Sequence, residues 1–94
     1  MIVMFNNIVE PRVFRELVAA GSVTNVIVQG ADKGLVIVLR VGLNERILGA
    51  VRGGPRYFQS IDGAASMLQQ AGIVKFEVDS SNWVPRTMAK KVAA

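Results

Sequence analysis

The chain has 94 residues, which is the size of one small domain. It contains no His and no Cys, so disulfide bonds and thiolate chemistry are excluded and a zinc site is strongly disfavoured. Eleven Lys and Arg residues against seven Asp and Glu residues leave a net charge of +4, which favours an anionic partner such as nucleic acid, a phosphate group or an acidic protein surface.

The first predicted helix begins close to residue 10. The run Ile2 to Phe5 before it is apolar and β-prone, and it is expected to be either a short edge strand or an unstructured start. Pro11 suits the first position of a helix, where its missing N–H has no intrahelical partner. Apolar residues at positions 13, 14, 17 and 18 form one stripe, and Gly21 is expected to end the helix in a left-handed conformation.

Three strands are predicted next, from Val23 to Gln29, from Leu35 to Val41 and from Glu45 to Val51. Glycine-containing turns at residues 30–34 and 42–44 connect them, and such short connections favour antiparallel hairpins. The middle strand is apolar on both faces until Arg40, which is typical of a central strand.

A second helix is predicted from Ile61 to Ala71. Ser60 is a favourable N-cap, and Asp62 in the first turn interacts well with the positive end of the helix. Gly72 is expected to end this helix. The alternating segment from Ile73 to Val78 then predicts a last strand.

These elements predict an α+β fold in the order α-β-β-β-α-β. We expect one mainly antiparallel sheet of three to four strands, with two helices packed on one face. Residues 1–85 are expected to form a single domain, and residues 86–94 a flexible basic C-terminal tail.

Few side chains are suited to catalysis. Glu77 and Asp79 lie two residues apart on a predicted strand and therefore share a face, where a carboxylate pair can bind a metal or act as acid and base. The same alternation is typical of the solvent-facing side of a half-buried strand, and we favour that interpretation. Since no His is present to act as a base near neutral pH, we expect a protein that is not an enzyme and that uses no cofactor, metal or small-molecule substrate.

No segment has the length of a membrane span. The longest wholly apolar interior run, Leu35 to Leu39, is far shorter than the roughly 20 residues that a spanning helix needs. The start of the chain also lacks the basic and apolar pattern of a signal peptide. We therefore expect no membrane contact and a cytoplasmic location.

The main candidates for nucleic-acid contact are basic side chains: Arg40, Arg46, Arg52, Arg56, Lys90 and Lys91. The first two flank a predicted turn, so they are expected to be neighbours across two strands. The next two flank the segment Gly53-Gly54-Pro55, just before a helix N-terminus, and glycine loops at such positions can hold phosphates. The two lysines would add nonspecific phosphate contacts. The alternative for each arginine is a solvated side chain paired with a nearby acid.

Three segments together resemble a known family: residues 7–17, the strand Leu35 to Val41, and residues 56–79. The last of them shows an Arg and an aromatic before an Ile-Asp-x-x-Ala helix, a Gly at the helix end, and a closing aromatic-acid-Val-Asp strand. The positions are Arg56, Phe58, Ile61, Asp62, Ala65, Gly72, Phe76, Glu77, Val78 and Asp79. The chain resembles the small ParC-family, partition-associated proteins of plasmids and integrative elements, which are unrelated to the topoisomerase subunit of that name.

The resemblance implies a non-enzymatic accessory of plasmid or integrative-element partition. Together with the arginines, it favours DNA binding through a basic sheet surface. The alternative is a protein-interaction module, which would dock on a partition or conjugation protein or on itself without nucleic acid. An apolar content of 51% in so short a chain favours a homodimer in either case.

Overall fold

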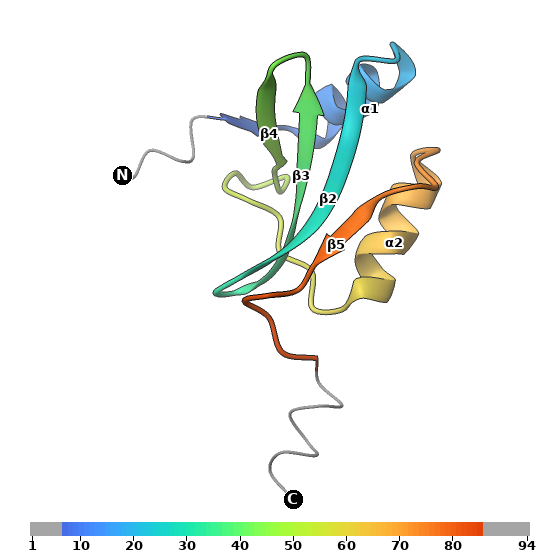
Figure 1. The fold of residues 1–94 in the computed structure, drawn as a ribbon. Coiled ribbons are helices and arrows are strands. Elements are labelled where there is room, and N and C mark those ends of the chain that lie inside the picture. The colour runs from blue at the N-terminus through green and yellow to red at the C-terminus, as the bar shows by residue number, and fades with distance from the viewer. Residues whose placement is uncertain (1–6, 86–94) are drawn as a thin grey trace, which may run out of the picture.

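The computed structural model describes residues 7–85, and these fold into one sheet with two helices (Figure 1). In chain order the elements are β1 (Ile8–Val9), α1 (Pro11–Ala19), β2 (Val23–Ala31), β3 (Gly34–Val41), β4 (Asn44–Leu48), α2 (Ile61–Gln70) and β5 (Glu77–Asp79). The predicted α+β class is confirmed. The order β-α-β-β-β-α-β adds one strand before the first helix.

Within the described residues the sheet has five strands in the order β1-β4-β3-β2-β5. The three central strands form the antiparallel meander that the short turns predict. The two edge strands are short, and each runs parallel to its neighbour, β1 to β4 and β5 to β2. The sheet is therefore mixed, with an antiparallel centre.

The first helix begins and ends where the sequence predicts. Pro11 occupies its first turn. At the other end, Gly21 has φ of 72°, which is the left-handed conformation that glycine adopts without steric cost. The Gly21 N–H donates to the Val18 carbonyl at 3.0 Å, and the Ser22 N–H donates to the Leu17 carbonyl at 2.9 Å. These bonds satisfy carbonyls that the helix end would otherwise leave unpaired.

The second helix is capped by Ser60, as predicted. The Ser60 hydroxyl oxygen accepts a hydrogen bond from the Gly63 N–H at 3.0 Å, and Asp62 lies in the first turn. After the last turn, the Ile73 N–H donates to the Leu68 carbonyl at 2.9 Å. The connection to β5 is therefore fixed at its start by the end of α2.

Both helices cover one face of the sheet, as predicted (Figure 1). Phe14 of α1 and Leu68 of α2 are fully buried and lie in one hydrophobic cluster with every second residue of the central strands. The buried strand residues of that cluster are Val26, Val28, Leu35, Ile37, Leu39 and Leu48. Because alternate residues of a strand point to opposite faces, this set defines the helix-covered face.

The third predicted strand is too long. β4 ends at Leu48, and Val51, which was expected to be in the strand, is 87% exposed. The chain reverses here because the Ala50 N–H donates to the Gly54 carbonyl at 2.9 Å instead of continuing the ladder.

The last predicted strand is displaced towards the C-terminus. The structure has β5 at Glu77–Asp79, whereas the alternating pattern predicted Ile73 to Val78. Ile73 is held by the helix end, and both Ile73 and Phe76 pack against the core from an irregular segment. The expectations for the run Ile2 to Phe5 and for residues 86–94 with Lys90 and Lys91 lie outside the described residues.

Candidate functional site

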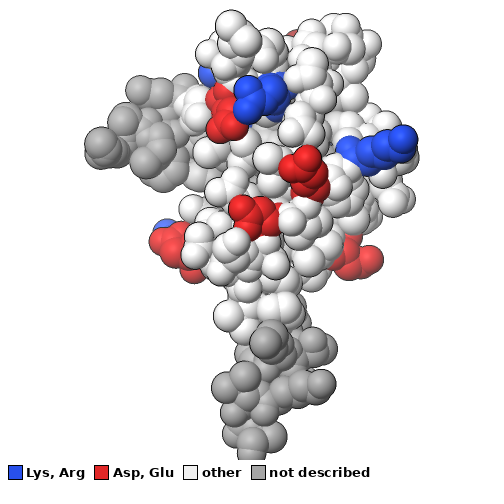
Figure 2. Space-filling model, in the orientation of Figure 1, with Lys and Arg blue, Asp and Glu red and all other residues white. Residues whose placement is uncertain are grey.

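The face of the sheet opposite the helices carries an apolar row that crosses four strands. Ile8, Ile47, Val38 and Ile27 are successive register partners on β1, β4, β3 and β2, and each is half-buried. No helix of the described residues covers this face, which is turned to the viewer in Figures 1 and 2. Figure 2 shows this face mostly uncharged, with two acidic groups near its middle and an acidic and a basic group side by side near its top. We call this face the open face.

Arg40 lies on the open face, but an acid on the next strand neutralises it. Its Nη2 is 3.2 Å from Oε2 of Glu45, its register partner on β4. The side chains are 45% and 55% exposed, and an ion pair so open to water contributes about 0–1 kcal/mol to stability. The alternative foreseen for the arginines, a solvated side chain paired with a nearby acid, describes Arg40.

Arg46 lies on the other face. Its register partner is Leu39, which is fully buried on the helix-covered side. Since Arg40 pairs with Glu45 and not with residue 46, the two arginines are one position out of register, and one position reverses the face. The structure therefore does not bring Arg40 and Arg46 together as cross-strand neighbours.

Arg52 and Arg56 belong to the loop between β4 and α2, and both are exposed. The Arg56 N–H donates to the Leu48 carbonyl at 2.9 Å, which ties this part of the loop to the sheet. The Arg56 guanidinium lies over the ring of Phe58, with Cζ 4.8 Å from the ring centroid. Phe58 is held by two backbone hydrogen bonds of 2.8 Å to Leu35 of β3, so the guanidinium rests on a fixed aromatic support.

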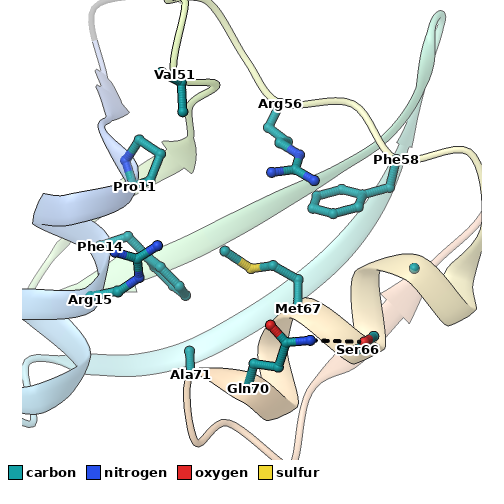
Figure 3. A pocket seen from close by; sticks show the side chains of 11 residues that line it. Pro11, Phe14, Arg15, Val51, Arg56, Phe58, Ser66, Met67, Gln70 and Ala71 are labelled. Atoms are coloured by element: carbon teal, nitrogen blue, oxygen red, sulfur yellow. Dashed lines mark hydrogen bonds between the residues drawn. The ribbon is translucent and has the colours of Figure 1, made fainter.

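A groove lies between α1, α2 and this loop, on the helix-covered side of the sheet (Figure 3). Its volume is about 530 Å³, which is within the range of ligand sites. Its apolar lining comes from Phe14, Val51, Phe58, Met67 and Ala71, and polar atoms make up the larger part of its exposed surface. We call it the inter-helix groove.

Two guanidiniums reach the inter-helix groove from different elements. Arg56 enters from the loop and Arg15 from α1 (Figure 3). The Gln70 amide and the Ser66 hydroxyl, which are 3.4 Å apart, add hydrogen-bonding groups on α2. Every residue that lines the groove has been placed by the structure, and neither Asp nor Glu is among them. The groove therefore combines apolar side chains, hydrogen-bonding groups and two positive charges.

Arg15 was not among the predicted site residues, because it lies off the apolar stripe of α1 and looked like an ordinary solvated residue. Arg12, three positions earlier, shares its flank of the helix and lines a neighbouring hollow with Arg15, Val51 and the acidic residue Glu10. Arg12 and Arg15 are three residues apart and therefore lie on the same side of α1. This spacing is the sequence signal that could have pointed to the groove.

Comparison with known families decides the relationship. A model of the ParC-like family matches residues 9–87, most of the chain. The chain belongs to this family. Neither a curated protein nor a solved structure gives a match.

In this ParC-like protein, the positions that carried the resemblance mainly support the fold. Phe58 is buried, Ile61 and Ala65 are half-buried on α2, and Phe76 packs against the core. Arg56 differs from them, because it is exposed and its guanidinium reaches the inter-helix groove. Asp62, Gly72, Glu77, Val78 and Asp79 are exposed as well, but they do not line the groove.

The carboxylate pair on β5 of this ParC-like protein lies on an exposed edge strand. Asp79 is fully exposed, and donation from the Ser81 hydroxyl and then from the Ser81 N–H holds its pKa below the ordinary value. A general acid or base near neutral pH needs a shift in the opposite direction. In residues 7–85, Glu77 and Asp79 have no third acidic ligand that would complete a metal site.

The helices of the ParC-like protein are short. Neither α1 nor α2, the helices found in residues 7–85, has the length and apolar character needed to cross a membrane.

Proposed function

We propose that the protein is a non-enzymatic accessory of plasmid or integrative-element partition that acts by binding other proteins. Membership of the ParC-like family supports the biological setting. The observation that carries the molecular part is the dispersal of the predicted arginines over different surfaces, while apolar atoms gather at two of them. Arg40, Arg46 and Arg56 point to three different places, whereas the inter-helix groove and the open face each offer apolar atoms to a partner.

Binding of DNA through a basic sheet surface receives less support from this arrangement. A duplex needs several cations on one side of the protein, because affinity arises from the combined release of counterions. On the open face, the arginine that the sheet presents is paired with Glu45, and Glu77 and Asp79 occupy the strand at its margin. Duplex DNA on the open face would therefore meet the negative charges of Glu77 and Asp79.

The proposal is tested by plasmid retention together with a direct DNA measurement. Deleting the gene from the element that encodes it should raise the rate of plasmid loss without selection, and the wild-type gene should restore retention. Fluorescence anisotropy with duplex DNA at 50 and 200 mM NaCl should show binding no tighter than about 10 µM at the lower salt. Unchanged retention, or sub-micromolar binding with a steep salt dependence, would contradict the proposal.

Self-association through the open face is part of the same proposal. The apolar row joins four strands without interruption, and pairing two copies would remove it from water. Sedimentation velocity between 5 and 500 µM should detect a dimer. Ile47→Gln should weaken it, whereas Leu43→Gln, at a turn residue that is 95% exposed, should leave it unchanged. Equal sedimentation of all three proteins as monomers would contradict self-association.

A further inference from the structure

The inter-helix groove is a feature of the fold that the core does not require. Phe14 and Phe58 are almost completely buried, yet both border the groove, so the groove reaches down to the hydrophobic core. Val51 at its rim is 87% exposed. Apolar surface of this kind is stabilised when an apolar group from a partner replaces water.

The two guanidiniums of the groove lack acidic partners in the described part of the chain. Within residues 7–85 the salt bridge joins Arg40 to Glu45, and Arg15 and Arg56 take no part in it. Both line a groove to which no acid contributes. Two like charges at one concave surface attract an anion that can sit near both, and a guanidinium binds a carboxylate through paired N–H groups.

We propose that the inter-helix groove binds an acidic segment of a partner protein, in which a carboxylate lies beside a large apolar side chain. The carboxylate accepts hydrogen bonds from Arg15 and Arg56, and the apolar side chain packs against Val51 and Met67, which line the groove and are at least partly open to solvent. This proposal rests on the proposed function, since it names the surface and the chemistry of the protein partner.

A nucleic-acid phosphate would fit the same groove less well. A phosphate satisfies the guanidiniums but leaves the apolar side chains of Val51 and Met67 in contact with water. Base stacking on an aromatic needs a free ring face, and Phe58 is almost completely buried with a guanidinium over its ring. A peptide that carries both an acid and an apolar side chain satisfies the charges and covers the apolar side chains together.

The first experiment titrates the ¹⁵N-labelled full chain with two acetylated ten-residue peptides. One has a core of alternating Glu and Leu, and in the other Gln replaces each Glu. The acidic peptide should shift the backbone amides of Ser66, Met67 and Gln70 and the Nε signals of Arg15 and Arg56. We expect a Kd between about 100 µM and 1 mM, a range typical of short unconstrained ligands. The Gln peptide should bind at least threefold more weakly.

A second experiment compares charge-matched variants. Arg15→Gln and Arg56→Gln should each weaken the acidic peptide about threefold to tenfold. Arg52→Gln removes the same charge from an exposed residue of the same loop that does not line the groove, and it should change the Kd less than twofold. Circular dichroism checks that all three variants fold, which is expected because the three side chains are exposed.

Each outcome decides the proposal. Absence of groove shifts with the acidic peptide, equal binding of the Gln peptide, or equal effects of all three substitutions would overturn it. Groove shifts of the same size with inorganic phosphate or a short DNA strand would assign the groove to phosphate instead. If deletion of the gene causes plasmid loss and genes encoding the Arg15→Gln and Arg56→Gln variants restore full retention, the groove proposal is rejected and the partition role stands. If the groove binds the acidic peptide but deletion of the gene causes no plasmid loss, the partition role is rejected and peptide binding by the groove stands.

Discussion

Truncation of Leu68 tests whether α2 is held on the sheet by the packing that the structure shows. Leu68 is fully buried and joins the core cluster from the last turn of α2. Leu68→Ala removes three carbon groups, each worth about 0.8 kcal/mol when buried, so the transfer loss is about 2.4 kcal/mol. The cavity that remains raises the expected loss to about 3–4 kcal/mol. A chain of 94 residues has about 5–14 kcal/mol of stability, so the variant should fold but with a reduced margin.

Leu43→Ala is the matched control, because it makes the same chemical change at a side chain that is 95% exposed. It should alter stability by less than about 0.5 kcal/mol. Urea unfolding followed by circular dichroism measures both, and Leu68→Ala should lower the midpoint by about 1.5–4 M for an m-value of about 1–2 kcal/mol/M. If Leu68→Ala costs less than about 1 kcal/mol, or no more than Leu43→Ala, then α2 does not pack as described.

Three further substitutions check the local geometry. Gly30→Ala should cost about 1–3 kcal/mol in urea unfolding, since the new Cβ would lie 2.8 Å from Cβ of Trp83 and the backbone there must move. Ser60→Ala should cost about 1 kcal/mol in the same assay, because it removes the hydroxyl that accepts from an α2 amide. For Asp79, the folded pKa lies below the ordinary value of 3.8, so its ionised form stabilises the fold above that pH and the contribution is lost as the pH falls through the folded value. Ser81→Ala should raise the pKa of Asp79 in an NMR titration, and an unchanged pKa would contradict the assigned hydrogen bonds.

The central strands and both helices could be predicted because their signals are local. Pro11, Gly21 and Ser60 mark helix ends through backbone chemistry that depends on immediate neighbours. The meander follows from turns whose two central residues fix the pairing of the flanking strands. These features do not depend on distant parts of the chain, so the sequence pattern was sufficient.

The edge strands were harder to predict because distant residues define them. β1 has two residues, Ile8 and Val9, and it is a strand because it pairs with β4 almost forty positions later. β5 pairs with β2 in the same way, and its residues are all exposed, so no buried face sets their periodicity. The alternation of apolar and polar residues from Ile73 to Val78 suggested a strand, but Ile73 and Phe76 are apolar because they pack against the core.

The sequence predicted only part of the candidate site, because residues far apart in the chain form it. The glycine-rich loop beside Arg56 suggested a nucleic-acid contact, which stays a prediction, and the structure places this side chain at a groove. Its companion Arg15 is more than forty positions away, and helix packing brings the two to one surface. The face to which Arg46 points depends on a single step of register in the β3–β4 hairpin, which the sequence pattern had not resolved.

The two proposed surfaces lie on opposite sides of the sheet, and this has a consequence for assembly. The inter-helix groove is on the helix-covered side, while the apolar row is on the open face. A dimer that pairs its open faces therefore leaves two grooves free, and a partner with two acidic segments would gain affinity from the raised effective concentration of the second. Two acidic peptides joined by a flexible linker should then bind at least tenfold more tightly than one. Ile47→Gln should remove that gain without changing the Kd of the single peptide. A gain that persists in monomeric protein would show that the linked peptides use a second site on one copy, and the assembly by open-face pairing would be rejected.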